Sequence, residues 1–190
     1  KEENEKLIKA KRVIVATGSA PASIPGFNID HNNILDSDDI LHPNFDTVPE
    51  SMIIIGGGVI GCEFANIFAE FGCKITILEY LDTILATEEK IIVRMAKKGL
   101  EKLGIDIHVS QNVISVEATD NGVVATTCDA KIPRNEVANA DKTKFTAEKC
   151  LISIGRKKIS EGLNLEKFGI KTEKSTILIN NRTMETDCPG

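Results

Sequence analysis

The sequence contains no tryptophan and only three histidines, and aromatic residues make up 4% of its 190 positions. With so few histidines and no metal-ligand spacing, it offers no pattern typical of a metal site. No apolar run approaches the roughly 20 residues that span a bilayer, so we expect no membrane partner. The net charge of −5 argues against nucleic acid as a partner.

The five cysteines lack the short spacings of redox pairs, and none forms C-x-x-C. We therefore expect buried or incidental thiols in a reducing compartment, which is the cytoplasm or, in a eukaryote, the mitochondrial matrix. Cys62 falls in the first turn of an expected helix, where a thiol pKa tends to fall. It has no partner in the sequence, so core packing is the interpretation we favour.

The composition is that of an ordinary globular protein, with 42% hydrophobic and 27% charged residues. The length suits one large domain or a domain with an appendage. The N-terminus is a charged run, residues 1–6, without the features of a signal peptide. Because the chain starts at Lys rather than Met, we expect a piece of a longer protein.

Residues 51–80, SMIIIGGGVIGCEFANIFAEFGCKITILEY, have the order of a βαβ unit. Residues 51–55 form a β-branched run, which predicts a strand buried on both faces. Apolar residues then recur at helical spacing from Ile60 to Phe71, and Gly72 is placed to end the helix. A second apolar run, residues 75–78, predicts another buried strand.

Gly56, Gly58 and Gly61 match the G-x-G-x-x-G pattern of dinucleotide-binding folds. There the first glycine permits a tight turn, the second lets a pyrophosphate approach the backbone, and the third lets the helix lie close to the sheet. Unpaired N–H groups at the helix start would face the phosphates. A turn that only joins a strand to a helix is the simpler alternative, but the flanking elements favour dinucleotide binding.

Glu79 closes the second strand, 18 positions after Gly61 (79 minus 61). This is close to the offset of about 20 residues expected for an acid that binds the ribose hydroxyls of NAD. An acid would repel the 2′-phosphate of NADP, and Tyr80, Leu81 and Asp82 supply no arginine. A solvated carboxylate at a strand end is the alternative.

The rest of the chain predicts further elements. Thr87 is a plausible N-cap for an amphipathic helix that carries Ile91, Ile92, Met95, Ala96, Leu100 and Leu103 and ends near Gly104. Asn121-Gly122 predicts a hairpin. Segments rich in apolar and β-branched residues predict strands at 12–16 (RVIVA), 105–109 and 149–155. Residues 35–41 (LDSDDIL) predict a short helix, and we expect the remainder of 27–50 to be irregular.

This order predicts an α/β fold: a Rossmann-like parallel sheet with a βαβαβ core, helices on one side and an antiparallel β-meander on the other. Ligands of such sheets bind beyond the carboxyl ends of the strands. Gly56 and Gly155 both lie at the carboxyl ends of predicted strands, so we expect them to flank one cleft.

Four motifs resemble those of the pyridine nucleotide-disulfide oxidoreductases, the two-dinucleotide flavoproteins, and most of all the dihydrolipoamide dehydrogenases. They are VIVATGSAPASIPG, GGGVIGCEFANIFAEFG, ILEYLDTIL and ISIGRKKISEGLNLEKFGI, in the order and at the spacing of that family. The resemblance implies an NAD- and FAD-dependent oxidoreductase that acts on a sulfur donor. It implies a homodimeric parent, with a 2-oxo acid dehydrogenase or glycine cleavage complex as its assembly.

In that family the NAD domain is inserted into a split FAD domain. The resemblance therefore implies that residues 1–46 are the end of the first FAD-domain segment and a linker, 47–172 the NAD-binding domain, and 173–190 the start of the return into the FAD domain. It places Thr17, Gly18 and Ser19 near FAD. It places along NAD the residues Gly56, Gly57, Gly58, Val59, Ile60, Gly61, Cys62, Glu63, Glu79, Val113 and Gly155.

Within that set, Ile60 and Glu63 would face the nicotinamide. Glu63 fits equally well as an anion in the first turn of a helix. The family's C-x-x-x-x-C, its first FAD-binding glycine motif, its GD motif and its C-terminal domain with the His–Glu base are absent from these residues. The resemblance thus implies that this chain holds NAD(H) but does not turn over alone.

Two other functions stay open. One is the NAD domain of a related flavoprotein, such as an NADH oxidase or a mercuric or glutathione reductase. The other is a stand-alone module that senses NADH. The segment GLNLEKFGI and Glu79 favour the dihydrolipoamide dehydrogenase type, and an ATGS loop has little use without FAD.

Overall fold

The computed structural model describes residues 7–24 and 26–189; the charged run at 1–6 lies outside them. The chain divides into two compact units. One comprises residues 21–155, and the other combines residues 1–20 with residues 156–190. The units begin and end at different residues from the domain limits expected above, and the assignment of segments to NAD and FAD domains stays a prediction.

The first unit is built on a parallel sheet with the strand order β2-β9-β3-β4-β5. Its strands are β2 (Ile34–Asp36), β3 (Ser51–Ile55), β4 (Lys74–Leu78), β5 (Asp106–His108) and β9 (Lys149–Ile152). Every neighbouring pair is parallel. The strand at 149–152, last in the sequence, thus lies between two earlier strands, which places its carboxyl end beside that of β3.

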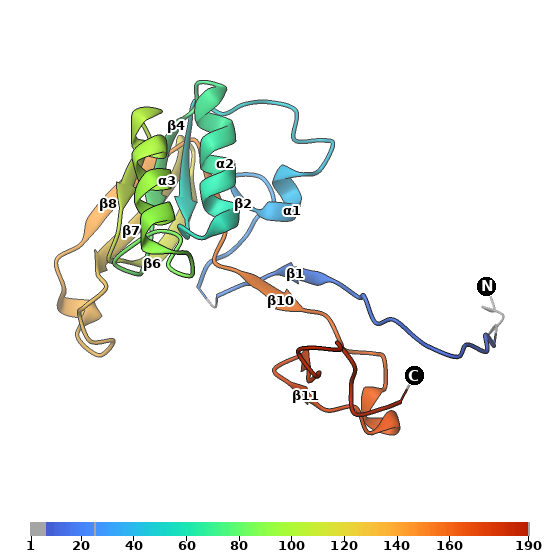
Figure 1. Ribbon diagram of the computed structural model, residues 1–190. Helices are drawn as coiled ribbons and strands as arrows, with labels where there is room; N and C mark the ends of the chain where they lie inside the picture. Colours follow the sequence, from blue (N-terminus) through green and yellow to red (C-terminus); the bar gives the residue numbers. More distant parts are fainter. Residues whose placement is uncertain (1–6, 25, 190) are drawn as a thin grey trace. The chain divides into compact units, whose positions relative to one another are not determined.

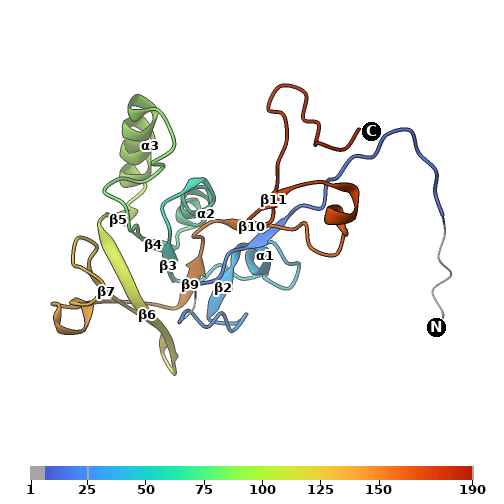
Figure 2. The same ribbon diagram turned by 90° about the horizontal axis from the view of Figure 1, so that it is seen from below.

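Three helices join these strands: α1 (Ser37–Ile40), α2 (Val59–Glu70) and α3 (Lys90–Lys102). Helix α2 ends as expected, with Gly72 in the left-handed region at φ +88° just beyond it. Figure 1 shows α2 and α3 next to each other, and Figure 2 shows both on the same side of the sheet. A continuous apolar core, which includes Leu35, Ile54, Ala65, Phe68 and Ile75, fills the space beneath them.

An antiparallel meander covers the other face, with the strands β6 (Gln111–Thr119), β7 (Gly122–Asp129) and β8 (Thr143–Ala147). A second core, which includes Ile53, Val116, Val123 and Cys150, joins the meander to the parallel sheet. The predicted fold class, with helices on one face and a meander on the other, is therefore confirmed. The predicted hairpin is also present, since Thr119 pairs with Gly122 across a two-residue loop.

The second unit contains little regular structure. Its elements are β1 (Ser19–Pro21, whose last residue falls in the first unit), β10 (Arg156–Lys158), β11 (Thr172–Glu173), β12 (Thr176–Ile177) and the 3₁₀ helix η2 (Leu165–Phe168). The short strands form two separate two-stranded sheets. A further 3₁₀ helix, η1 (Val137–Asn139), belongs to the first unit.

Several sequence expectations are wrong in detail. Residues 12–16 are not a strand, and Ile14 is 90% exposed. An apolar run becomes a strand only where another strand can pair with it, and among the described residues none pairs with this one. Conversely, β2 was not expected: Ile34 lies in the stretch expected to be irregular, and Leu35 and Asp36 lie at the start of the expected short helix, which begins only at Ser37. Ile34 and Leu35 are buried where β2 pairs with β9.

Helix α3 also differs from the prediction in the residue at which it begins and in which of its side chains face the core. It begins at Lys90, not after Thr87, because the Glu88 N–H is held by the Leu85 carbonyl in a separate turn. Val93 and Leu100, seven residues apart, share the face that meets the core. Four apolar side chains expected on that face are instead exposed: Ile91, Ile92, Met95 and Leu103.

No helix in the described part of the chain is both long enough and apolar enough to cross a membrane.

Candidate dinucleotide-binding site

The three glycines that follow β3 form a turn at the carboxyl edge of the parallel sheet. Gly56 has φ +105°, a backbone conformation that side chains disfavour. A Cβ atom there would lie 2.5 Å from the carbonyl oxygen of Ser153. The Gly56 N–H donates to the Leu78 carbonyl at 2.9 Å, so the turn is fixed between β9 on one side and β4 on the other.

Gly61 is required by packing against the turn itself. A Cβ atom on it would overlap the carbonyl oxygen of Gly56 and lie 2.8 Å from the Ser153 hydroxyl. The expectation that this glycine lets α2 lie close is therefore confirmed, with the glycine turn and the end of β9 as the surfaces that it approaches.

Gly58 differs from both, because none of the described residues crowds it. It is the N-cap of α2 with φ −72° and ψ −175°, extended values that any residue adopts. A Cβ atom there would meet nothing within 4 Å. Gly58 has no side chain with which to cap the helix. The N–H groups of the first turn, which have no helical partners, are therefore suited to hold an anion at this open position.

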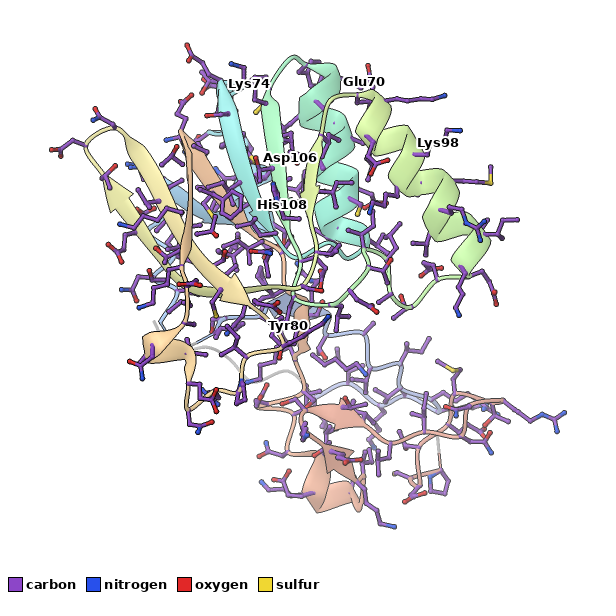
Figure 3. The ribbon with its side chains drawn as sticks, turned by 90° about the vertical axis from the view of Figure 1, so that its left-hand side faces the viewer. Glu70, Lys74, Tyr80, Lys98, Asp106 and His108 are labelled. Atoms are coloured by element: carbon purple, nitrogen blue, oxygen red, sulfur yellow. The ribbon has the colours of Figure 1, made fainter. Side chains whose placement is uncertain are left out.

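Glu79 lies directly after β4, and the fold brings it to the glycine turn. Its side chain is buried, with one oxygen accepting the Gly57 N–H at 2.5 Å and the other the Leu81 N–H at 2.7 Å. A carboxylate has about four acceptor positions, so these two bonds leave capacity for hydroxyl donors. Figure 3 shows Lys74 and Tyr80 at opposite ends of β4, with Tyr80 at the Glu79 end.

Cys62 faces inward from the first turn of α2. Its thiol donates to the Gly57 carbonyl at 3.4 Å. Burial, with smaller contributions from the charges of Glu79 and Glu63, raises the pKa of the Cys62 thiol to about 11. The helix-start effect on its pKa is thus outweighed, and core packing is the interpretation that the structure bears out.

The remaining residues assigned to NAD by resemblance lie outside the glycine turn itself, on α2, β6 and the residues after β9. Ile60 is half-buried and Glu63 is exposed on the first turns of α2, where Val59 is also exposed. Val113 is half-buried against the meander-side core. Gly155 has φ +118°, and its carbonyl accepts the Ala22 N–H at 3.0 Å.

One residue near the turn was missed by sequence reasoning. The Ser153 hydroxyl lies 3.0 Å from the Ile55 carbonyl and 3.1 Å from the Gly56 carbonyl, and its single proton can be donated to either. It joins the end of β9 to the start of the glycine turn. A lone serine before Ile-Gly carries no spacing pattern, so nothing in the sequence marked it.

In the second unit, the loop assigned to FAD by resemblance, residues 17–19, is hydrogen-bonded to Arg156 of β10 and to Ile159, which follows β10. The Arg156 guanidinium donates to the Ser19 hydroxyl at 2.8 Å and to its carbonyl at 2.7 Å. The Thr17 hydroxyl donates to the Ile159 carbonyl at 2.5 Å, and the Gly18 carbonyl accepts the Ile159 N–H at 3.1 Å. Gly18 has φ +76°, which explains a glycine there.

Two other groups carry reactive side chains. All five cysteines are free thiols, and burial raises the pKa of Cys73 to about 11 and that of Cys150 further. His31, Asp36 and Asp39 bring ligand-type atoms within 4.8 Å of one another. Asp36 and Asp39 form the capping box of α1, and Asp39 pairs with His31, so this cluster is explained by local structure.

A glycine turn at the carboxyl edge of a parallel sheet, with an acid closing the next strand, defines an α/β protein of the Rossmann-like type. The family model of the pyridine nucleotide-disulphide oxidoreductases matches residues 1–190. A dihydrolipoyl dehydrogenase of Bacillus subtilis is 38% identical over 179 residues, covering 94% of this chain and 36% of that protein. The chain belongs to the pyridine nucleotide-disulphide oxidoreductase family.

Further relatives agree. Dihydrolipoyl dehydrogenase 3 of Haloarcula marismortui is 32% identical over 180 residues, covering 95% of this chain and 36% of that protein. Among solved structures, the HOCl-induced flavoprotein disulfide reductase of Escherichia coli has a TM-score of 0.73 at 27% identity, covering 92% of this chain and 37% of that one. The chain spans only about a third of the length of these relatives.

Proposed function

We propose that this chain is the NAD-binding part of a longer flavoprotein disulfide reductase of the dihydrolipoamide dehydrogenase type. Residues 47–172 would form the NAD domain, 1–46 and 173–190 the adjoining segments of a split FAD domain. Two observations support the proposal: the family membership, and relatives named dihydrolipoyl dehydrogenase that are about three times as long.

The observation that carries the nucleotide assignment is the contrast between Gly58 and its neighbours. Gly56 and Gly61 are required by contacts within the protein. Gly58 has ordinary backbone angles and open space around it, so neither strain nor internal packing requires a glycine there. Open space alone does not imply a ligand, since Gly99 on α3 shares it. Gly58 differs from Gly99 in being the N-cap of α2, where a pyrophosphate must approach the backbone to reach the N–H groups of the helix.

Each residue then has a role in holding NAD(H). The N–H groups at the start of α2 bind the pyrophosphate. Glu79 accepts hydrogen bonds from the adenosine ribose and disfavours a 2′-phosphate, so NAD(H) is preferred over NADP(H). Ile60 and Glu63 face the nicotinamide, Val113 and Gly155 complete the NAD site, and in the whole protein Thr17, Gly18 and Ser19 lie near FAD.

In the whole protein, the bound cofactors would carry electrons from dihydrolipoamide, through a disulfide and FAD, to NAD⁺. The contribution of this chain is to orient the nicotinamide, which accelerates a reaction through positioning. The 190 residues contain no C-x-x-x-x-C, so we expect the chain alone to be colourless and without dihydrolipoamide-dependent NAD⁺ reduction. The homodimer, the interface domain and a 2-oxo acid dehydrogenase or glycine cleavage complex belong to the whole protein in this proposal.

The experiment is a calorimetric NADH titration of the wild-type chain and two valine variants. Gly58→Val should abolish binding with little change in melting temperature, because the added side chain fills the place of the pyrophosphate. Gly99→Val is the matched control: Gly99 also lies in open space, on α3 away from the turn, and its variant should bind like the wild type. Normal binding by Gly58→Val would refute the nucleotide assignment.

A further inference from the structure

Between the end of β4 at Leu78 and the start of α3 at Lys90, residues 81–87 form a segment without regular secondary structure. One side chain of this segment is nevertheless fully buried. Ile84 is 0% exposed and belongs to the core beneath the helices. Its neighbours on either side include the polar Asp82, Thr83 and Thr87. Leu85 also packs, partly buried, against the same core. The connecting segment is therefore held in place by its own side chains.

Ile84 occupies the space beside Gly57, the middle residue of the glycine turn. A Cβ atom on Gly57 would lie 2.6 Å from Ile84 Cγ2 and 3.2 Å from Ile84 Cβ. Gly57 is not one of the three glycines of the G-x-G-x-x-G pattern. Its lack of a side chain is explained by Ile84, which packs directly against the Gly57 backbone.

Backbone hydrogen bonds join the same two segments. The Gly57 carbonyl accepts the Leu85 N–H at 2.8 Å. The Gly57 N–H binds one oxygen of Glu79, whose other oxygen accepts the Leu81 N–H. Both polar groups of Gly57 are thus held, directly or through Glu79, by the 81–87 segment, which orients the peptide units that precede the start of α2.

Leu85 supplies an independent observation. It has φ +49°, a left-handed conformation that is unusual for a large side chain. Such strain persists only where the surroundings enforce it, and it is concentrated at functional sites. Here the Leu85 N–H is bound to Gly57 and the Leu85 carbonyl accepts the Glu88 N–H at 2.9 Å, so the strain is maintained by contact with the glycine turn.

We propose that Ile84 is a positioning residue for the nucleotide site: by holding the 81–87 segment against Gly57, it fixes the glycine turn in the shape that presents the α2 N–H groups to a pyrophosphate. This inference rests on the proposed function. It assigns part of the nucleotide affinity to a residue outside the glycine pattern that does not itself touch the ligand. A side chain that only filled the core would affect stability and leave affinity unchanged.

The test compares Ile84→Ala with Ile75→Ala, which makes the same deletion in the same core at the start of β4, away from the turn. Both variants should melt at lower temperature. At a temperature where both are folded, Ile84→Ala should raise the Kd for NADH by about tenfold or more through lost pre-organisation, whereas Ile75→Ala should bind like the wild type. Ile84→Val retains two γ-carbons and should restore most of the affinity.

Amide chemical shifts, measured without ligand, separate this inference from the proposed function. Ile84→Ala should move the amide signals of Gly57, Gly58 and Val59, and Ile75→Ala should leave them in place. If the wild type failed to bind NADH, the proposed function would fall while the shifts still tested the positioning. If Ile84→Ala bound NADH as tightly as the wild type, or left these signals unmoved, the positioning role would be wrong.

Discussion

The two units of the chain handle their apolar side chains in opposite ways. Residues 21–155 bury them in two continuous cores, one on each face of the parallel sheet. Among the described residues of the other unit, only Leu165 is buried, while Val13 is 71% and Ile14 90% exposed. The difference indicates that the first unit has the core of an independently stable domain, whereas the second does not bury enough apolar surface to stabilise itself.

That contrast accords with our proposal that residues 1–46 and 173–190 belong to a split domain of a longer protein, since residues 1–20 and 173–190 lie in the second unit. A segment such as RVIVA would then find its partner strands outside these 190 residues. The strands that the second unit does form are two or three residues long, which is shorter than the usual strand length of about five or six residues.

We expect the greatest change in stability to separate two variants, each with one isoleucine replaced by alanine, one in each unit. Ile53→Ala removes a fully buried side chain from the meander-side core and should lower the free energy of unfolding by about 2–5 kcal/mol. Ile14→Ala removes an exposed one and should change it by less than about 0.5 kcal/mol. Chemical denaturation measures the free energy of unfolding of both variants. Equal losses would mean that the two units do not differ in how much their apolar side chains stabilise the chain.

A smaller effect is expected at the nucleotide site. Glu79→Ala should weaken NADH binding by about 1.5–3 kcal/mol, the range for a hydrogen bond to a charged group. Because Glu79 also accepts the Gly57 and Leu81 N–H groups, part of this loss will come from a loosened turn. Asp106→Ala, which removes an exposed acid from the edge strand β5 (Figure 3), is the control and should bind normally. An unchanged Kd for Glu79→Ala would reduce the acid to a structural role.

The smallest effect is expected at Glu161, whose pKa reports whether the second unit keeps its local contacts in solution. Hydrogen bonds from Lys157 and Ser175 lower the pKa of the exposed Glu161 carboxyl to about 2. A lowered pKa favours folding above the ordinary pKa of Glu, near 4.5, and this contribution is lost as the pH falls towards 2. Carbon-13 NMR titration should find the pKa of the Glu161 carboxyl well below the ordinary value for Glu, and Lys157→Ala should raise this pKa. An ordinary pKa for Glu161 would mean that these contacts are not maintained in solution.

The predictable parts of the molecule are those encoded by local spacing. Residues 51–80 combine apolar runs, helical periodicity and glycines, so the βαβ unit and the place of Glu79 followed from the sequence. The three-residue strand β2 is too short to show a period, and the exposure of Ile91 and Met95 depends on how α3 rotates onto the core. Ile84 and Ser153 act through contacts with residues far along the chain, which no local pattern reveals.

We propose that the glycine turn and Glu79 form a site for NAD(H), and calorimetric titration of the 190-residue chain with NADH and with NADPH under one set of conditions decides whether they do. We expect saturable binding of NADH, tighter than that of NADPH, because Glu79 offers acceptors for hydrogen bonds from ribose hydroxyls and repels a 2′-phosphate. Equal affinities, a preference for NADPH, or no binding of either cofactor by the folded chain would contradict it.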